Sequence, residues 1–195
     1  MLFDWPGFFL YVVIQTFTPG PNTMSTLANA SRVGVKRNMP FALGIVTGVV
    51  GITFACGMIY DSIHQLIPQI KPVMLVVGAV YLLYLAWKIY KTDFEAERSR
   101  PIKGNTYLNG IMLEFVNPKL ILYSLTVMSN YVVGVYHGPL MIAGFALLVG
   151  LVCFASLLSY ALFGSLILRT LTKYGKLVNI VLALALVYCA ISLFL

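Results

Sequence analysis

Charged residues are scarce in this sequence. Only 10% of the 195 residues are Asp, Glu, Lys or Arg, whereas soluble domains carry about 25%. Hydrophobic residues make up 60% of the chain, and so much apolar surface cannot be kept out of water in a soluble domain of this length. The composition fits helices that face lipid on one side and each other on the other. It excludes an ordinary soluble protein and predicts an integral membrane protein.

Clustered metal, redox and catalytic residues are also lacking. The three cysteines, Cys56, Cys153 and Cys189, lie inside apolar runs and form no CxxC pair. We expect each to be a buried small residue rather than part of a disulfide, a zinc site or a redox centre. Both histidines lie outside the apolar runs, whereas a serine protease within the membrane would pair a Ser with a His there. We predict no metal, no cofactor and no enzymatic activity.

Six long apolar runs occupy most of the chain. A membrane-spanning helix needs about 20 mostly apolar residues, and such runs lie near residues 3–31, 40–60, 72–91, 107–131, 138–163 and 176–195. We therefore predict an all-α integral membrane protein with six transmembrane helices in one domain, residues 1–195. Asp4 stands where a signal peptide would carry a basic residue, so we expect the first run to be a retained span.

The basic residues indicate the orientation of the chain. Of the 13 Lys and Arg residues, all except Lys71 and Lys119 lie in or beside the first, third and fifth connections between spans. Positively charged loops stay in the cytoplasm, so we expect both termini outside. The net charge of +7 is thereby explained by topology and by contact with anionic lipid, and it does not indicate a nucleic-acid partner. A homodimer is compatible with the sequence.

The first and fourth spans share a motif. Residues 15–19 read Gln-Thr-Phe-Thr-Pro and residues 114–118 read Glu-Phe-Val-Asn-Pro. Each places a polar residue three positions before a small polar residue and a proline. Tyr84 and Tyr188 also recur in matching positions near the ends of the third and sixth spans. Matches in the same order along the chain predict an internal repeat.

The repeat divides the chain into residues 1–91 and 105–195, joined by a charged cytoplasmic linker at 92–104. Each half has three spans, so the second half enters the membrane inverted. Such 3+3 inverted repeats, with helices broken near the midplane, recur among transporters. An ordinary helical bundle with proline kinks is the alternative.

Helix-breaking residues lie in both motifs. Residues 18–22 read Thr-Pro-Gly-Pro-Asn, and proline lacks an N–H and clashes with the carbonyl one turn earlier. We therefore predict that the first and fourth helices are broken at mid-membrane. Thr18 and Asn117 each precede a proline, as an N-cap precedes the first helical residue. Carbonyls freed by a break must line protein or a wet cavity, because lipid cannot hydrogen-bond to them.

The two breaks define a candidate binding site. Two helix N-termini that converge from opposite sides attract an anion such as a carboxylate. Glu114 and Lys119 lie deep in a span, where a charge costs about 2.5–3.5 kcal/mol. We expect Lys119 to bind a substrate carboxylate and Glu114, with Gln15, to bind an α-amino group. Glu114 would also exchange a proton, which couples export to the proton gradient. A purely structural ion pair between Glu114 and Lys119 is the alternative.

The predicted site residues comprise both breaks, Gln15 and the recurring tyrosines. The predicted substrate-binding residues are Gln15, Thr18, Pro19, Gly20, Pro21, Asn22, Tyr84, Asn117, Pro118, Lys119 and Tyr188, with Glu114 for proton coupling.

These motifs resemble those of a known family. Residues 18–22, followed by a basic stretch and by Gly44-xxx-Gly48, and the triplet 117–119, Asn-Pro-Lys, resemble the two signatures of the LysE/RhtB amino-acid exporters over essentially the whole chain. Residues 84–89 and 174–184 are most similar to the cysteine/O-acetylserine exporter branch. The resemblance implies proton-driven secondary export of small neutral amino acids across a bacterial cytoplasmic membrane.

Other functions remain as alternatives. The first is export of another amino acid, such as homoserine, threonine or a basic amino acid. Export of an ion is disfavoured, because a metal site needs several clustered ligands and only Glu114 lies deep in the membrane. A membrane-embedded enzyme is the least favoured. A structural or sensory protein would not need helix breaks at matched positions.

Overall fold

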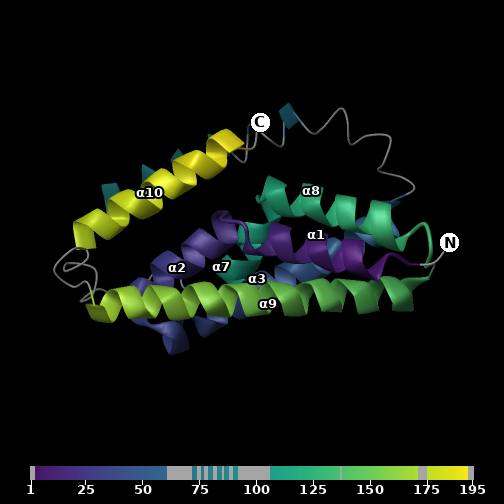
Figure 1. Cartoon of the computed structure of the whole chain (residues 1–195), viewed down its shortest axis with the longest axis horizontal. Helices are drawn as coiled ribbons and strands as arrows, with labels where there is room; N and C mark the ends of the chain where they lie inside the picture. The colour runs from purple at the N-terminus through teal and green to yellow at the C-terminus, as the bar shows by residue number, and fades with distance from the viewer. Residues whose placement is uncertain are drawn as a thin grey trace.

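The computed structural model describes residues 3–60, 106–136, 138–170 and 175–192, with scattered positions between 72 and 91. Within them the regular elements are all helical (Figure 1). They are α1 (Trp5–Phe17), α2 (Pro21–Val33), α3 (Val35–Met58), α7 (Tyr107–Phe115), α8 (Pro118–Val127), the π-helix η1 (Met128–Val132), α9 (Pro139–Thr170) and α10 (Gly175–Ser192). The predicted linker at 92–104 lies outside the described residues, as does much of the predicted span at 72–91.

Two of these helices are long and apolar enough to cross a membrane. They are α3, with 24 residues, and the segment Pro139–Gly164 of α9, with 26 residues. A third candidate span consists of α7 followed by α8 and η1, which are bent by 71° at the break between them. The described residues thus hold two candidate spans, or three with the bent pair, as judged by length and composition.

The first predicted break separates α1 from α2. Proline disfavours helical backbone in the residue before it, and Pro19 and Pro21 act in this way on Thr18 and Gly20. Both residues are extended: Thr18 has ψ of 131° and caps the end of α1, and Gly20 caps the start of α2. Thr18 was predicted to be the N-cap of the second half-helix, and that prediction is wrong because Pro21, not Pro19, takes the first helical position.

The second break follows the prediction more closely. α7 ends at Phe115, and Asn117 is the N-cap of α8, with extended backbone and with its side chain accepting a hydrogen bond from the Leu120 N–H at 3.4 Å. Pro118 is the first residue of α8, where its missing N–H leaves no hydrogen bond unmade. The N-cap predicted at Asn117 is confirmed.

Glycines bring α3 and α7 into backbone contact. A Cβ atom on Gly44 would collide with the Tyr107 carbonyl, and one on Gly110 would collide with the Phe41 carbonyl. A Cβ on Gly48 would lie only 2.7 Å from Cγ of Glu114. Small residues allow such close crossings in membranes, so the glycine pair Gly44-xxx-Gly48 fixes α7, and with it Glu114, against α3.

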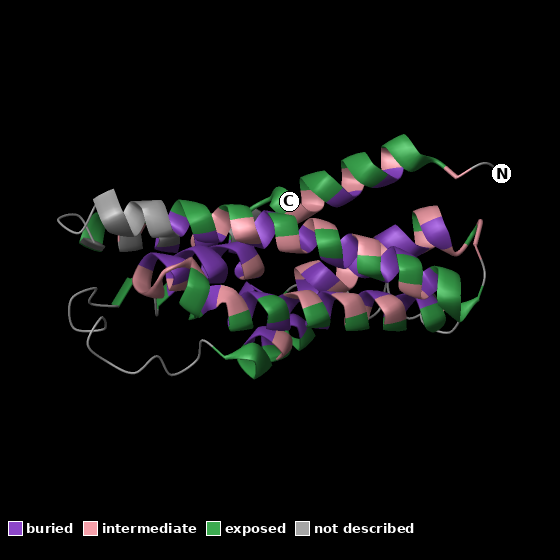
Figure 2. Ribbon diagram, turned by 90° about the horizontal axis from the view of Figure 1, so that it is seen from below, coloured by how far each residue is buried: buried purple, intermediate pink, exposed green. Residues whose placement is uncertain are grey.

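The apolar core lies between α1, α3, α8, η1 and α9. Among its fully buried members are Phe8, Val12, Ile45, Met128, Val149 and Leu157. Figure 2 shows buried residues on the sides of helices that face one another and exposed residues on the outer sides. Large apolar side chains remain exposed on those outer sides, for example Ile14 and Leu151, as expected for surfaces that contact lipid.

Candidate substrate-binding site

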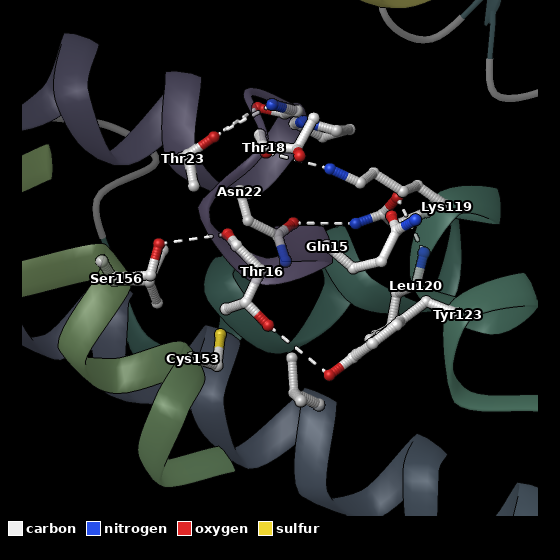
Figure 3. Close-up of a pocket in the computed structure, with 15 residues that line it drawn as sticks. Gln15, Thr16, Thr18, Asn22, Thr23, Lys119, Leu120, Tyr123, Cys153 and Ser156 are labelled. Carbon is white, nitrogen blue, oxygen red and sulfur yellow. Dashed lines mark hydrogen bonds between the residues drawn. The ribbon is translucent and has the colours of Figure 1, made fainter. Parts of the chain in front are cut away.

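The two helix breaks meet. Lys119 in the first turn of α8 donates from Nζ to the main-chain oxygen of Thr18 at 2.9 Å, across 101 positions of sequence. Nδ2 of Asn117 donates to Oδ1 of Asn22 at 2.8 Å. A Cβ added to Gly20 would lie 3.3 Å from Nζ of Lys119, so glycine lets the lysine approach the break. The structure thus brings residues 18–22 and 117–119 together (Figure 3).

The carbonyl end of α1 is held by side chains from two other helices. Ser156 and Tyr160 of α9 donate to the main-chain oxygens of Thr16 and Phe17, at 3.1 and 2.8 Å, and Lys119 donates to the next one. The last carbonyls of a helix lack partners within the helix and carry partial negative charge. A lysine ammonium and two hydroxyl groups satisfy them here, which permits the break inside a membrane-embedded chain.

A pocket of about 460 Å³, its open mouth included, lies at the junction. Its lining residues come from α1, α2, α3, α8, α9 and the two breaks. They are Gln15, Thr16, Thr18, Gly20, Pro21, Asn22, Thr23, Val49, Asn117, Lys119, Leu120, Tyr123, Cys153, Ser156 and Leu157. Figure 3 shows Lys119, Thr18 and Gln15 around one part of the pocket and Cys153 and Tyr123 around another. No acidic side chain is among these lining residues.

Glu114 lies behind the pocket wall. It is fully buried, and its Oε2 accepts a hydrogen bond from Nδ2 of Asn22 at 3.1 Å. Its other oxygen, Oε1, has no hydrogen-bond partner within the described structure. Asn22 itself lines the pocket. The carboxyl group therefore reaches the pocket through Asn22.

The predicted substrate-binding residues divide into three groups. Seven line the pocket: Gln15, Thr18, Gly20, Pro21, Asn22, Asn117 and Lys119. Pro19 and Pro118 set the backbone of the two breaks. Tyr84 and Tyr188 do not line this pocket, and 54% and 69% of their surfaces are exposed. Tyr188 follows the buried Leu186 by two positions, which places it on the opposite face of α10.

Sequence reasoning missed the contribution of α9. Cys153 and Ser156 line the pocket, and Ser156 and Tyr160 bond to the end of α1. All three lie on one face of α9, because their spacing of three and four residues matches the helical repeat. Polar residues at that spacing within an apolar run were the available signal. Thr16 and Tyr123 were also missed, and their hydroxyl oxygens are 3.5 Å apart.

Within the described ranges there is no group of three or more His, Cys, Asp or Glu side chains that could hold a metal ion. No solved structure matches the chain.

Comparison with known sequences identifies the family. Residues 13–195 match the family described as LysE type translocator. A cysteine/O-acetylserine efflux protein from Salmonella typhimurium (strain LT2) is 34% identical over 188 residues, covering 96% of this chain and 96% of the relative. A protein of the same name from Escherichia coli (strain K12) is 32% identical with the same coverage. The chain therefore belongs to the LysE type translocator family, whose members are multi-pass membrane transporters and not enzymes.

Proposed function

We propose that this protein is a secondary transporter that exports small neutral amino acids, such as cysteine and O-acetylserine, across the bacterial cytoplasmic membrane. The observation that carries the proposal is the meeting of two helix breaks at a pocket, with Lys119 bonded to Thr18 across it. Relatives that span 96% of the chain are named for efflux of cysteine and O-acetylserine. Substrate sites formed by broken helices are typical of secondary transporters.

One end of the pocket suits the charged groups of an amino acid. Lys119 and the N-terminus of α8 offer positive charge to the substrate carboxylate. The carbonyl end of α1 offers partial negative charge to the α-amino group, beside the side chain of Gln15. Lys119 bonds to the Thr18 carbonyl, so a substrate carboxylate would compete with that oxygen for the ammonium group.

The other part of the pocket suits a small uncharged side chain. Val49, Cys153 and Leu157 contribute apolar or weakly polar surface there, and the hydroxyl groups of Thr16 and Tyr123 lie nearby. A basic substrate side chain would meet no carboxylate among the lining residues, and an unpaired charge is costly to bury. We therefore favour neutral over basic amino acids.

The architecture proposed for this activity is six spans in a 3+3 inverted repeat, with residues 1–91 and 105–195 as the halves and both termini outside. The order of elements supports it. In each half a short helix (α1 or α7), a break and a second short helix (α2 or α8) are followed by a long apolar helix (α3 or α9).

Glu114 is proposed as the proton-coupling residue. It is fully buried, and it is linked by Asn22 to the pocket. A carboxyl group in that place can load a proton from the outer side and release it to the cytoplasm as an amino acid leaves in the opposite direction.

Counterflow in proteoliposomes tests the substrate class. Purified protein is reconstituted with an internal excess of one unlabelled amino acid, and uptake of the labelled compound is followed for cysteine, O-acetylserine, serine, homoserine, threonine and lysine. We expect exchange of cysteine and O-acetylserine, and none of lysine. Exchange of lysine alone would favour a basic substrate instead, and no exchange of any neutral amino acid would overturn the proposal.

A further inference from the structure

We propose that Asn22 and Asn117 form a directional hydrogen-bond relay that transmits the protonation state of Glu114 to the substrate pocket and to the start of α8. This inference rests on the proton-coupling role proposed for Glu114. It adds a positioning role for two amide side chains, which join that carboxyl group to both helix breaks.

The relay has three links. The backbone N–H of Leu120 donates to Oδ1 of Asn117 at 3.4 Å, Nδ2 of Asn117 donates to Oδ1 of Asn22 at 2.8 Å, and Nδ2 of Asn22 donates to Oε2 of Glu114 at 3.1 Å. Glu114 and Asn117 are 0% and 2% exposed, so water does not readily replace these partners. Three helices, α2, α7 and α8, are thereby joined in one chain of donors and acceptors.

Chemistry fixes the direction of this chain. A backbone N–H can only donate, and the Leu120 N–H donates both to the main-chain oxygen of Asn117 at 3.1 Å and to its Oδ1 at 3.4 Å, so this amide oxygen faces the start of α8. The nitrogen of Asn117 then faces Asn22, which must present its oxygen in turn. That leaves the nitrogen of Asn22 facing Glu114, so Oε2 must accept. The N-cap of α8 thus determines the hydrogen-bonding role of one oxygen of the carboxyl group.

The charge of Glu114 determines how firmly the relay is held. A hydrogen bond to an ionised carboxylate is roughly twice as strong as one to a neutral group, so the ionised form holds Asn22 away from other partners. A proton on Oε1, which has no partner within the described structure, weakens that bond. A proton on Oε2 places two donors face to face and breaks it. In both cases Asn22, which lines the pocket, becomes free to bond the substrate.

The two relay amides supply the polar contacts of Glu114: Asn22 donates to Oε2, and the side chain of Asn117 also lies near the carboxyl group. From α3, Gly48 packs against the side chain so closely that a Cβ atom there would lie 2.7 Å from Cγ. From α9, the side chain of Cys153 lies near both Glu114 and Lys119. From α8, Lys119 donates to Thr18, and from α2 comes Asn22. Cys153 is therefore an ionisable neighbour of Glu114.

The test compares the pH dependence of substrate affinity in proteoliposomes that hold the whole protein. KM for labelled O-acetylserine is measured between acid and alkaline pH for the wild type, Glu114→Gln, Asn22→Ala, Asn117→Ser and the double variant Asn22→Ala/Glu114→Gln. Asn109→Ala is the matched control, because this asparagine is exposed on the same helix as Glu114. Asn117→Ser keeps a residue suited to an N-cap but is too short to reach Asn22.

The relay predicts that KM varies with pH in the wild type and in Asn109→Ala, and that the variation disappears in Glu114→Gln. Asn22→Ala and Asn117→Ser should flatten it to less than about a quarter of the wild-type range, and the double variant should show no further loss. A uniformly raised KM that keeps the full pH variation in Asn22→Ala would overturn the relay and leave Asn22 as a substrate contact only.

Two other outcomes are also decisive. Unchanged pH variation of KM in Glu114→Gln would contradict the proton-coupling role of Glu114, and therefore also the relay that depends on it. Flattening in Asn109→Ala would show that the effect is not specific to the relay and would overturn it. If Asn22→Ala does not fold, as judged by its elution from a sizing column, Asn117→Ser decides the question alone.

Discussion

The ammonium group of Lys119 lies 2.9 Å from the main-chain oxygen of Thr18, a residue 101 positions earlier in the sequence. This contact joins the negative end of α1 to the start of α8, so each broken segment completes the polar requirements of the other. It also places a cation beside the pocket without an acidic residue on the pocket lining. A substrate carboxylate can therefore replace a neutral carbonyl as the partner of Lys119, which strengthens the bond.

Replacing Lys119 with Met should weaken substrate binding. The change removes the cation proposed for the carboxylate, and it leaves the Thr18 oxygen without this donor. We expect KM for O-acetylserine to rise at least about 10-fold, since a charged hydrogen bond contributes about 1.5–3 kcal/mol. Lys176→Met, on the exposed start of α10, is the control and should transport normally. An unchanged KM in Lys119→Met would rule out the carboxylate role.

Replacing Gly48 with Ala should disturb Glu114. The added methyl group would lie 2.7 Å from Cγ of Glu114, and overpacking of this kind costs about 1–3 kcal/mol. We expect a lower melting temperature in detergent and slower transport. Gly51→Ala on the same helix is a close control, because nothing lies within 4 Å of a Cβ atom there. The account of this crossing fails if both variants behave alike.

Removing the hydroxyl of Ser156 should destabilise the end of α1. The Thr16 carbonyl would lose its donor from α9, at a cost of about 1 kcal/mol, and Tyr160→Phe should act in the same way on Phe17. Ser159→Ala is the control, because Ser159 bonds to a carbonyl of its own helix. Thermal unfolding in detergent measures the difference. Equal melting temperatures for Ser156→Ala and Ser159→Ala would contradict this role of α9.

Shortening Cys153 should broaden the range of substrates. Cys153 lines the pocket, whereas Cys56 is buried and is not among the lining residues, so the two Cys→Ala variants form a matched pair. We expect Cys153→Ala to raise the transport of leucine relative to O-acetylserine by roughly 10-fold, since a methylene-sized change in an apolar pocket is worth about 1–3 kcal/mol. Cys56→Ala should leave the ratio unchanged. A shift of the same size in both variants would place the substrate side chain elsewhere.

The sequence predicted those features of the site that depend on local chemistry. The prolines at 19, 21 and 118 cannot continue a helix, so both breaks could be located, and Asn117 could be identified as an N-cap. Thr18 was assigned wrongly because two prolines in succession offer two starting points for the next helix. Only the observed backbone shows that Pro21 provides the start.

Features that depend on the packing of distant segments could not be predicted in this way. The partners of the α1 carbonyls lie on α9, about 140 positions away, and no local rule links a serine to a carbonyl at that distance. The helix faces on which Tyr84 and Tyr188 lie could not be predicted either, because the surrounding residues are apolar on every side and give no amphipathic pattern. Whether a buried carboxyl group lines a pocket or lies behind it depends on such packing, as Glu114 shows.

The central claim is that the substrate binds between the two breaks, and thiol labelling tests it most directly. In a background with Cys56, Cys153 and Cys189 replaced by Ser, single cysteines are introduced by Thr18→Cys and Phe17→Cys. Both positions are exposed, but only Thr18 lines the pocket. The account predicts that O-acetylserine slows the labelling of the Thr18→Cys protein at least several-fold and leaves the Phe17→Cys protein unaffected. Equal labelling of the Thr18→Cys protein with and without substrate would contradict it.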